Sequence, residues 1–209
     1  ETFSPLYPEV ETWIHRDEGK TVFEADPLQD QLIGAARMIE KRDEVPVFLD
    51  AITPQIELDN DTFFGGAGLF TANYLSKPSF YVWKYLSLMG EEILHEGEGV
   101  LLTRSDEGIQ LLLYAEKEED STPTRLNLFG MEEDMWISSF TMSRKEGSIY
   151  DAWKDLGSPE RLSEEHWYLL NRYVHPSLDL SFGEKKIVYS IRRNIDAPSI
   201  VLYLFNKIQ

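Results

Sequence analysis

Between residues 26 and 43, apolar side chains recur every three or four positions, and this spacing predicts an amphipathic helix. Asp26 and Pro27 suit its first turn, and Gln29 stands at the spacing of a capping box. The apolar face of the expected helix consists of Leu28, Leu32, Ala35, Ala36 and Ile39.

A short apolar run at 45–49 contains two β-branched valines and predicts a buried strand. A helix followed by a buried strand is typical of an α/β unit rather than of a sandwich. The glycine-rich stretch between Phe63 and Leu69 favours a turn with close backbone approach. It is not a dinucleotide-binding fingerprint, because no strand-to-helix turn of the right spacing surrounds it.

A second, aromatic helix is expected over residues 78–89. Ser76 can cap it, Pro78 fits its first turn, and Gly90 can end it. The segment before residue 91 is a piece of α/β structure with only one clear strand, which cannot complete a parallel sheet by itself. Apolar side chains should therefore be exposed in residues 1–90 and favour rearrangement or self-association. The residues expected to be exposed are Leu28, Leu32, Val47 and Leu49.

After Gly90 the pattern changes to short runs of strand character separated by turn residues. A helical interlude interrupts them at about 148–174, and the run near 200–205 is apolar on both faces, which predicts a central strand. About eight strands with hairpin spacing favour a β-sandwich. The expected strands lie near 93–95, 100–104, 110–115, 125–129, 136–142, 177–182, 186–192 and 199–206.

Composition narrows the function classes. The formal charge of −17 opposes direct contact with nucleic acid, although the acidity itself needs no more explanation than solubility. The chain has no cysteine, which excludes disulfides, thiolate metal sites and Cys nucleophiles. No apolar run approaches 18 residues, so no membrane contact is expected, and we expect a cytoplasmic protein. Abundant aromatic residues suit sandwiches and sugar-binding proteins alike.

The most distinctive sequence segment is RKEGSIYDAWKDLGSPE at 144–160. It closely resembles a segment in the C-terminal sandwich of the family 39 glycoside hydrolases, the β-xylosidase group. Further similarity lies at 65–69, 77–81, 88–92, 103–104 and 111–114, in the order of the family, so that the resemblance covers roughly 60–205. The same architecture also resembles the C-terminal region of certain AraC-type transcription regulators.

This resemblance implies a mostly β fold with an α+β portion. Residues 1–90 would be a partial (β/α)8-barrel remnant consisting of a helix, a strand and a helix. Residues 91–209 would be an antiparallel β-sandwich accessory domain with the helical insertion at about 148–174. The first residue, Glu1, suggests that the chain is cut from a larger protein.

The resemblance also bears on catalysis. A retaining glycosidase needs two carboxylates about 5 Å apart. In the family, the acid/base follows a barrel strand with no counterpart in this chain, and the nucleophile position would fall just before residue 1 if residues 2–5 match the stretch after it. Glu1 is a poor candidate because it lies too close to Pro5. Where the family carries a sugar-stacking Trp, this chain has Ile52. We therefore expect no catalytic residue here.

Other candidate chemistry is weak, and no metal or cofactor is expected. The histidines His15, His95, His166 and His175 show no metal-ligand spacing. The acidic loop with Glu57, Asp59 and Asp61 lacks the glycine and terminal glutamate of an EF-hand. Tyr150, Asp151 and Trp153 could form a sugar subsite, but we favour an aromatic anchor that pins the 148–157 turn to the sandwich, with Asp151 capping local amides. Glu160, Glu164 and Glu165 suit a helix start.

Three functions remain open. The first is a non-catalytic C-terminal module of a carbohydrate-responsive transcription regulator. The second is the C-terminal part of an active β-xylosidase-like exo-glycosidase, and the third is an independent carbohydrate-binding sandwich. The expected partners are a carbohydrate ligand and, through residues 1–90, the remainder of a barrel or another protomer.

Overall fold

The computed structural model describes residues 27–40, 62–63, 65, 69–71, 73–116, 122–131, 133–195 and 197–208. The helices are η2 (Pro27–Asp30), α1 (Leu32–Glu40), α2 (Pro78–Leu86), α3 (Ile149–Asp155) and α4 (Glu164–Tyr173). The strands are β1 (Glu92–Gly97), β2 (Val100–Ser105), β3 (Gly108–Ala115), β4 (Thr122–Met131), β5 (Met135–Ser143), β6 (Ser177–Gly183), β7 (Lys186–Ile195) and β8 (Ser199–Lys207). All eight strands expected after residue 90 are present, and α3 and α4 fall in the expected helical interlude. The strand expected at 45–49 lies outside the described residues.

The strands form two antiparallel sheets. One has six strands in the order β1-β2-β3-β8-β5-β6, and the other is the pair β4-β7. Strand β8 lies between β3 and β5, so the central position expected from its apolar character is confirmed. The mostly β, antiparallel sandwich is therefore the observed fold class.

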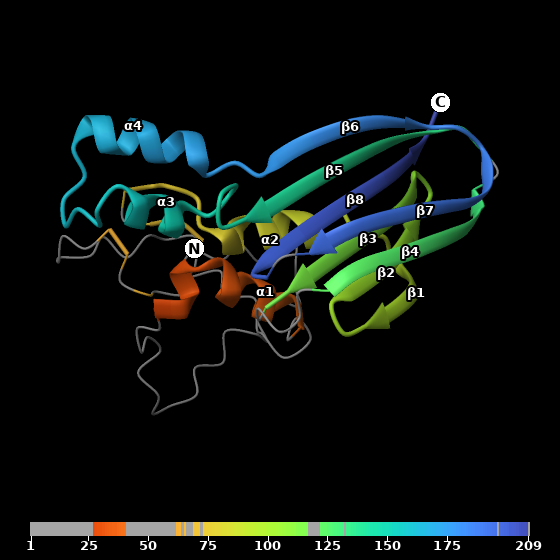
Figure 1. The fold of residues 1–209 in the computed structure, drawn as a ribbon, viewed down its shortest axis with the longest axis horizontal. Helices are drawn as coiled ribbons and strands as arrows, with labels where there is room; N and C mark the ends of the chain where they lie inside the picture. The colour runs from red at the N-terminus through yellow and green to blue at the C-terminus, as the bar shows by residue number, and fades with distance from the viewer. Residues whose placement is uncertain are drawn as a thin grey trace, which may run out of the picture.

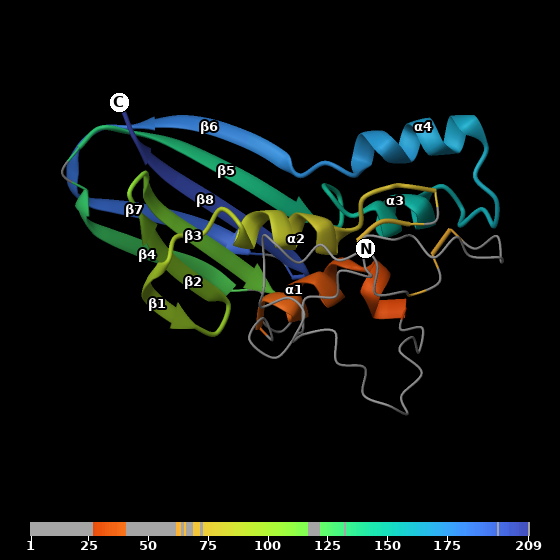
Figure 2. The same ribbon diagram turned by 180° about the vertical axis from the view of Figure 1, so that it is seen from behind.

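The six-stranded sheet is covered on both faces of its centre. On one face, Ile200 and Leu202 of β8 pack with α1 and α2. On the other face, Val201 and Phe205 pack against the two-stranded β4-β7 sheet, whose Leu128 and Ile191 are buried. The β4-β7 pair lies on the near side in Figure 1, and the view from behind in Figure 2 brings α1 and α2 to the front. Alternation along one strand thus supplies two separate cores.

Helix α1 follows the predicted pattern at its centre and departs from it at its start. Leu32, Ala35, Ala36 and Ile39 are each at most 1% exposed, which confirms the predicted apolar face. The predicted helix is nevertheless two pieces, because residues 27–30 form a 3₁₀ turn and the α-helix begins at Leu32. The expected cap, Asp26, lies outside the described residues.

Helix α2 starts at Pro78 as expected, but its cap differs from the prediction. The N-cap is Lys77 in extended conformation with no side-chain capping bond, so the assignment of Ser76 as cap is wrong. The Ser76 side chain instead forms a hydrogen bond with Tyr81. After α2 the chain meets the sheet at Gly90, whose N–H donates to Thr103 Oγ1 at 2.8 Å and to Gln110 Oε1 at 3.1 Å. A Cβ on Gly90 would lie 2.0 Å from the Arg104 carbonyl oxygen, so this close approach requires glycine.

A buried ion pair joins the two helical segments that precede the sandwich. Lys77 Nζ contacts Asp30 Oδ1, and the two side chains are 1% and 2% exposed. The other carboxylate oxygen of Asp30 accepts a 2.6 Å hydrogen bond from the Gly65 N–H. Gly65 has a φ of 81°, a conformation that suits glycine and fits the turn expected in this stretch. We call these three residues the Asp30 clasp.

Of the four apolar residues expected to be exposed before residue 91, one is buried and one is partly exposed. Leu32 is 1% exposed, because it packs with α2 and the sheet, and Leu28 is only partly exposed. Val47 and Leu49 lie outside the described residues. No helix in the described part of the chain is long and apolar enough to cross a membrane.

Candidate functional site

The candidate site is a recess of about 670 Å³ between α4 and the loop that precedes α2. It lies on a small third core, where Leu75 of that loop packs with Ile149 of α3 and with Leu170 and Val174 at the end of α4. This core fixes α4 against the loop and leaves the first turns of α4 accessible. The recess is lined by Asn73, Leu162, Ser163, Glu164, Glu165, Trp167 and Tyr168.

The loop side of the recess is held by its own hydrogen bonds. Thr71 is fully buried, its N–H donates to the Leu75 carbonyl at 2.9 Å, and its hydroxyl accepts from the Leu75 N–H at 3.1 Å. Tyr74 at the loop tip has a φ of 60° and a side chain that is 68% exposed. A non-glycine residue in this conformation persists only where its surroundings enforce it. Asn73 is therefore presented to α4 on a defined turn.

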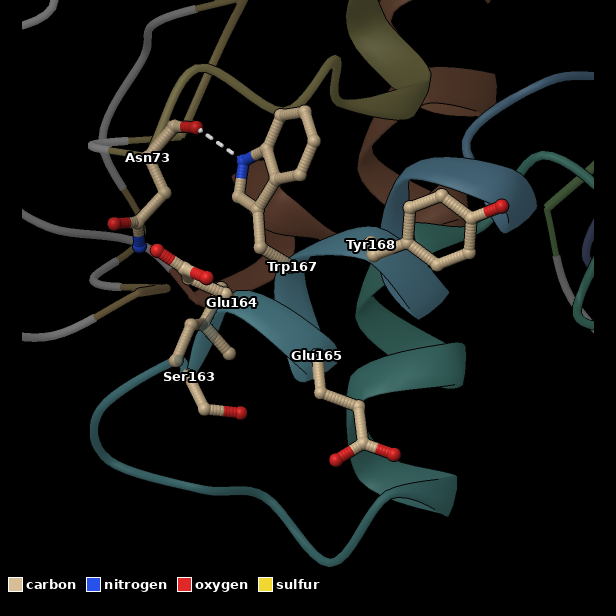
Figure 3. A pocket seen from close by; sticks show the side chains of 7 residues that line it. Asn73, Ser163, Glu164, Glu165, Trp167 and Tyr168 are labelled. Carbon is tan, nitrogen blue, oxygen red and sulfur yellow. Dashed lines mark hydrogen bonds between the residues drawn. The ribbon is translucent and has the colours of Figure 1, made fainter.

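The helix side begins with a capped turn. The Ser163 hydroxyl accepts a 3.1 Å hydrogen bond from the His166 N–H, as an N-cap residue does. Glu164 and Glu165 lie in the first turn of α4, so the expectation that they suit a helix start is confirmed. Figure 3 shows their side chains pointing in different directions, with Glu164 on the Asn73 side.

Trp167 connects the two sides. Its indole N–H donates to the Asn73 carbonyl oxygen at 3.0 Å while its side chain is still 39% exposed. Figure 3 shows the ring turned toward the loop, whereas Tyr168 leaves the helix on another side. A fixed, accessible indole beside a carboxylate and an amide can stack on an apolar ring face and accept or donate hydrogen bonds at its rim. The recess thus combines a stacking surface with hydrogen-bonding groups at its rim.

The sequence analysis named Glu164 and Glu165 only as residues that suit a helix start, and it did not name Trp167, Tyr168 or Asn73 as site residues. A usable signal was present in α4. Leu170 and Val174, four residues apart, define the buried face. Trp167 stands three and seven residues before them on the same face, so the spacing singles out Tyr168 as the aromatic residue that must reach the surface.

The aromatic residues of the 148–157 turn serve a structural role, with contacts that differ from those expected. Phe63 packs on Tyr150 and Trp153 with ring centroids 5.4 and 5.1 Å apart, and the Trp153 indole N–H donates to the Pro159 carbonyl at 3.0 Å. These ring contacts, as far as the described residues show, pin the turn to Phe63 and to Pro159 rather than to a sandwich strand. Asp151 accepts a hydrogen bond from the Ser148 hydroxyl.

The described histidines are not among the residues that line the recess, and His15 lies outside the described residues. His95 is exposed on β1, and His166 Nδ1 is buried with no hydrogen-bond partner in the described part of the chain. His175 Nδ1 lies 2.9 Å from the Tyr81 hydroxyl. Burial raises the pKa of that hydroxyl, and its hydrogen bond with Ser76 partly opposes the rise. Within the described ranges, no three His, Asp or Glu side chains gather where they could hold a metal ion.

Two carboxylates are held in ion pairs that have structural roles. Asp30 is the buried carboxylate among the described residues, and Lys77 and Gly65 occupy both of its oxygens. Glu116 is paired with Arg37 of α1. Glu1, Ile52 and the acidic loop with Glu57, Asp59 and Asp61 lie outside the described residues.

Proteins similar to this chain are found among curated sequences and solved structures. No family model matches the chain. A β-xylosidase of Geobacillus stearothermophilus is 23% identical over 160 residues, which cover 70% of this chain and 32% of that protein. The chain thus spans about a third of the length of the curated relative that it matches.

Solved structures give the fold. The chain is similar to the GH39 enzyme of Xanthomonas axonopodis pv. citri with a TM-score of 0.72 and 14% identity, covering 89% of this chain and 43% of that one. A monomeric β-xylosidase of Caulobacter crescentus CB15 gives a TM-score of 0.67 and 18% identity, with coverage of 90% and 44%. A bacterial orthologue of human α-L-iduronidase gives 0.64 and 15%, with coverage of 90% and 40%. The chain has the fold of a family 39-like C-terminal region.

Proposed function

We propose that this chain is a non-catalytic C-terminal module of a family 39-like protein and that it contacts carbohydrate through the recess on α4. The observation that carries the proposal is the state of Trp167, which is held by the Asn73 carbonyl and remains 39% exposed beside Glu164. Sugar-binding surfaces use such fixed aromatic faces, because little side-chain entropy is lost on binding.

Titration with xylo-oligosaccharides tests this part of the proposal by tryptophan fluorescence. The chain has 5 Trp, so the response must be assigned with variants. Trp167→Ala should abolish a response that saturates at millimolar sugar. Trp136→Ala is the matched control, since Trp136 is 53% exposed on β5 and does not line the recess. A flat signal in the unchanged protein, or an unchanged response in W167A, would contradict the proposal.

The finer proposal is that the parent protein is a carbohydrate-responsive transcription regulator of the AraC type. Ile52 at the position of the expected Trp favours a module that senses or transmits rather than hydrolyses. A cytoplasmic location belongs to this form of the proposal. It predicts a DNA-binding domain elsewhere in the full-length gene product, and sequencing that product decides it.

The second candidate is the C-terminal part of an active exo-glycosidase. The names of the relatives favour it, since they include β-xylosidases of two bacteria. It predicts that the full-length parent hydrolyses nitrophenyl pentosides or uronides, with carboxylates supplied from outside the described residues. Absence of turnover on all such substrates would exclude this candidate and leave the sensor proposal.

A further inference from the structure

Strand β6 has an uncovered apolar face at the edge of the large sheet. Leu178, Leu180 and Phe182 of β6 are 54%, 63% and 50% exposed, and Trp136 of the adjoining strand β5 is 53% exposed. The β5-β6 register places Trp136 opposite Phe182, and their rings are 5.6 Å apart in an edge-to-face arrangement. These four side chains, which we call the β6 patch, lie on the same side of the sheet.

The backbone of β6 is also open on its outer side. It is the last strand in the order of the large sheet, and within the described ranges no strand pairs with its other edge. Figure 1 shows it along one long border of the sheet. An edge strand presents unpaired N–H and C=O groups and is usually protected by lysine, proline or a bulge. Residues 177–183 contain neither lysine nor proline, and their register with β5 is regular.

The sequence of β6 is self-complementary in one antiparallel register. Residues 177–183 read SLDLSFG, which is symmetric in character about Leu180. If two copies pair about this residue, Leu180 faces itself and Leu178 faces Phe182 of the second copy. Asp179, on the other side of the strand, then faces Ser181 and never another carboxylate, so no like charges oppose one another.

We propose that β6 pairs with β6 of a second copy of this chain, antiparallel and centred on Leu180, so that the large sheet continues across a two-fold axis. The pairing supplies hydrogen-bond partners to the open edge and places two β6 patches in contact. The charge of −17 on each chain opposes association at long range, but at physiological salt such repulsion is screened over about 8 Å. The β6 patch itself contains no charged residue.

Sedimentation tests the surface. At roughly 100 μM, a concentration at which even a weak contact is populated, the chain should sediment above its monomer mass of 24.2 kDa. Leu180→Lys should return it to the monomer. Phe129→Lys is the matched control, since Phe129 is 71% exposed on β4 and lies outside the patch. A monomeric unchanged chain, or association that survives L180K, would overturn the proposal.

Cross-linking tests the register. The chain has no cysteine, so a single introduced thiol reports one position. Directly opposed residues of an antiparallel pair have Cα atoms about 4.5 or 5.5 Å apart, within the range of a disulfide. Leu180→Cys should therefore form a cross-linked dimer rapidly under mild oxidation. Leu178→Cys should not, because its copies would lie about 13 Å apart along the strands, whereas a mixture of L178C and F182C should cross-link.

Charge placed at Ser181 tests the same register without oxidation. Ser181→Lys should meet Asp179 of the second copy twice and tighten association about three- to tenfold at low salt, with the gain lost at high salt. Ser181→Asp should weaken association. If L180C cross-links no faster than L178C, or if S181K and S181D act alike, the proposed pairing is wrong.

Discussion

Strands β8 and β6 belong to one sheet, yet their leucines differ in burial. Leu202 of β8 and Leu180 of β6 project from the same face. Leu202 is fully buried under α1 and α2, whereas Leu180 is 63% exposed. Alternation along a strand tells which side is apolar, but only the arrangement of other elements decides whether that side is covered. The covered centre should therefore control folding, and the β6 edge should control association.

The largest loss of unfolding free energy should come from breaking the Asp30 clasp, which joins the helical segments that cover the sheet. Lys77→Met leaves the Asp30 carboxylate buried without its cation, and breaking such a pair costs about 3–5 kcal/mol. Urea unfolding measures this loss. Adding Asp30→Asn to K77M should recover part of it, because the uncompensated charge is then removed; no recovery would mean that the cation is not what the carboxylate needs.

A slightly smaller loss should follow from opening a cavity under the helices. Leu202→Ala removes a fully buried side chain that α1 and α2 cover, and we expect about 2–5 kcal/mol of destabilisation. The denaturation midpoint should fall with little change in the denaturant slope. A loss below about 1 kcal/mol would show that the helices do not hold this face closed.

The covered face should also be sensitive to alkali through Tyr85. Burial raises the pKa of the Tyr85 hydroxyl far above its ordinary value of 10, with a smaller contribution from Tyr81. The Tyr85 hydroxyl loses its proton at lower pH in the unfolded chain than in the folded one. Its contribution to the free energy of unfolding should therefore be fully present below pH 10 and should fall above pH 10 by about 1.4 kcal/mol per pH unit.

Tyr85→Phe is the corresponding test. The Tyr85 hydroxyl is buried with no hydrogen-bond partner among the described residues, so Y85F should leave stability at pH 7 nearly unchanged or slightly higher. Urea unfolding at pH 8 and pH 11 should show a smaller alkaline loss in Y85F than in the unchanged protein. Equal losses would place the alkaline sensitivity elsewhere.

The smallest effect on the unfolding free energy should come from a substitution on the exposed strand β6. Leu180→Ala should change the unfolding free energy of the dilute monomer by less than about 0.5 kcal/mol, because the side chain is already 63% exposed. The same variant should weaken association at high concentration. A stability loss comparable to that of L202A would mean that Leu180 is covered within the single chain.

Local pattern was enough to predict the elements. Short runs of strand character between turn residues predicted all eight strands, and the spacing of Leu32, Ala35, Ala36 and Ile39 predicted the buried face of α1. The apolar character of both faces of β8 also predicted its central position. These features depend on residues close together in the chain, where spacing alone determines which side chains share a face.

Long-range features escaped prediction for a physical reason. Asp30 and Lys77 are far apart in sequence, and no local pattern around either residue indicates that the two form an ion pair. The strand order, in which β8 separates β3 from β5, likewise depends on how distant segments pack. Trp167 was missed because its role comes from the Asn73 carbonyl, which only the folded loop brings to it. The division of the chain at residue 91 stays a prediction.

The place of β8 in the chain has a consequence for synthesis. β8 follows every other strand in the sequence, yet it joins β3 to β5. During translation, the β1-β2-β3 portion and the β5-β6 portion therefore emerge before the strand that unites them. Nascent chains that stop short of residue 199 would leave both portions with an unpaired inner edge, open to chaperones and proteases. The two portions become one sheet only when β8 pairs with both of them.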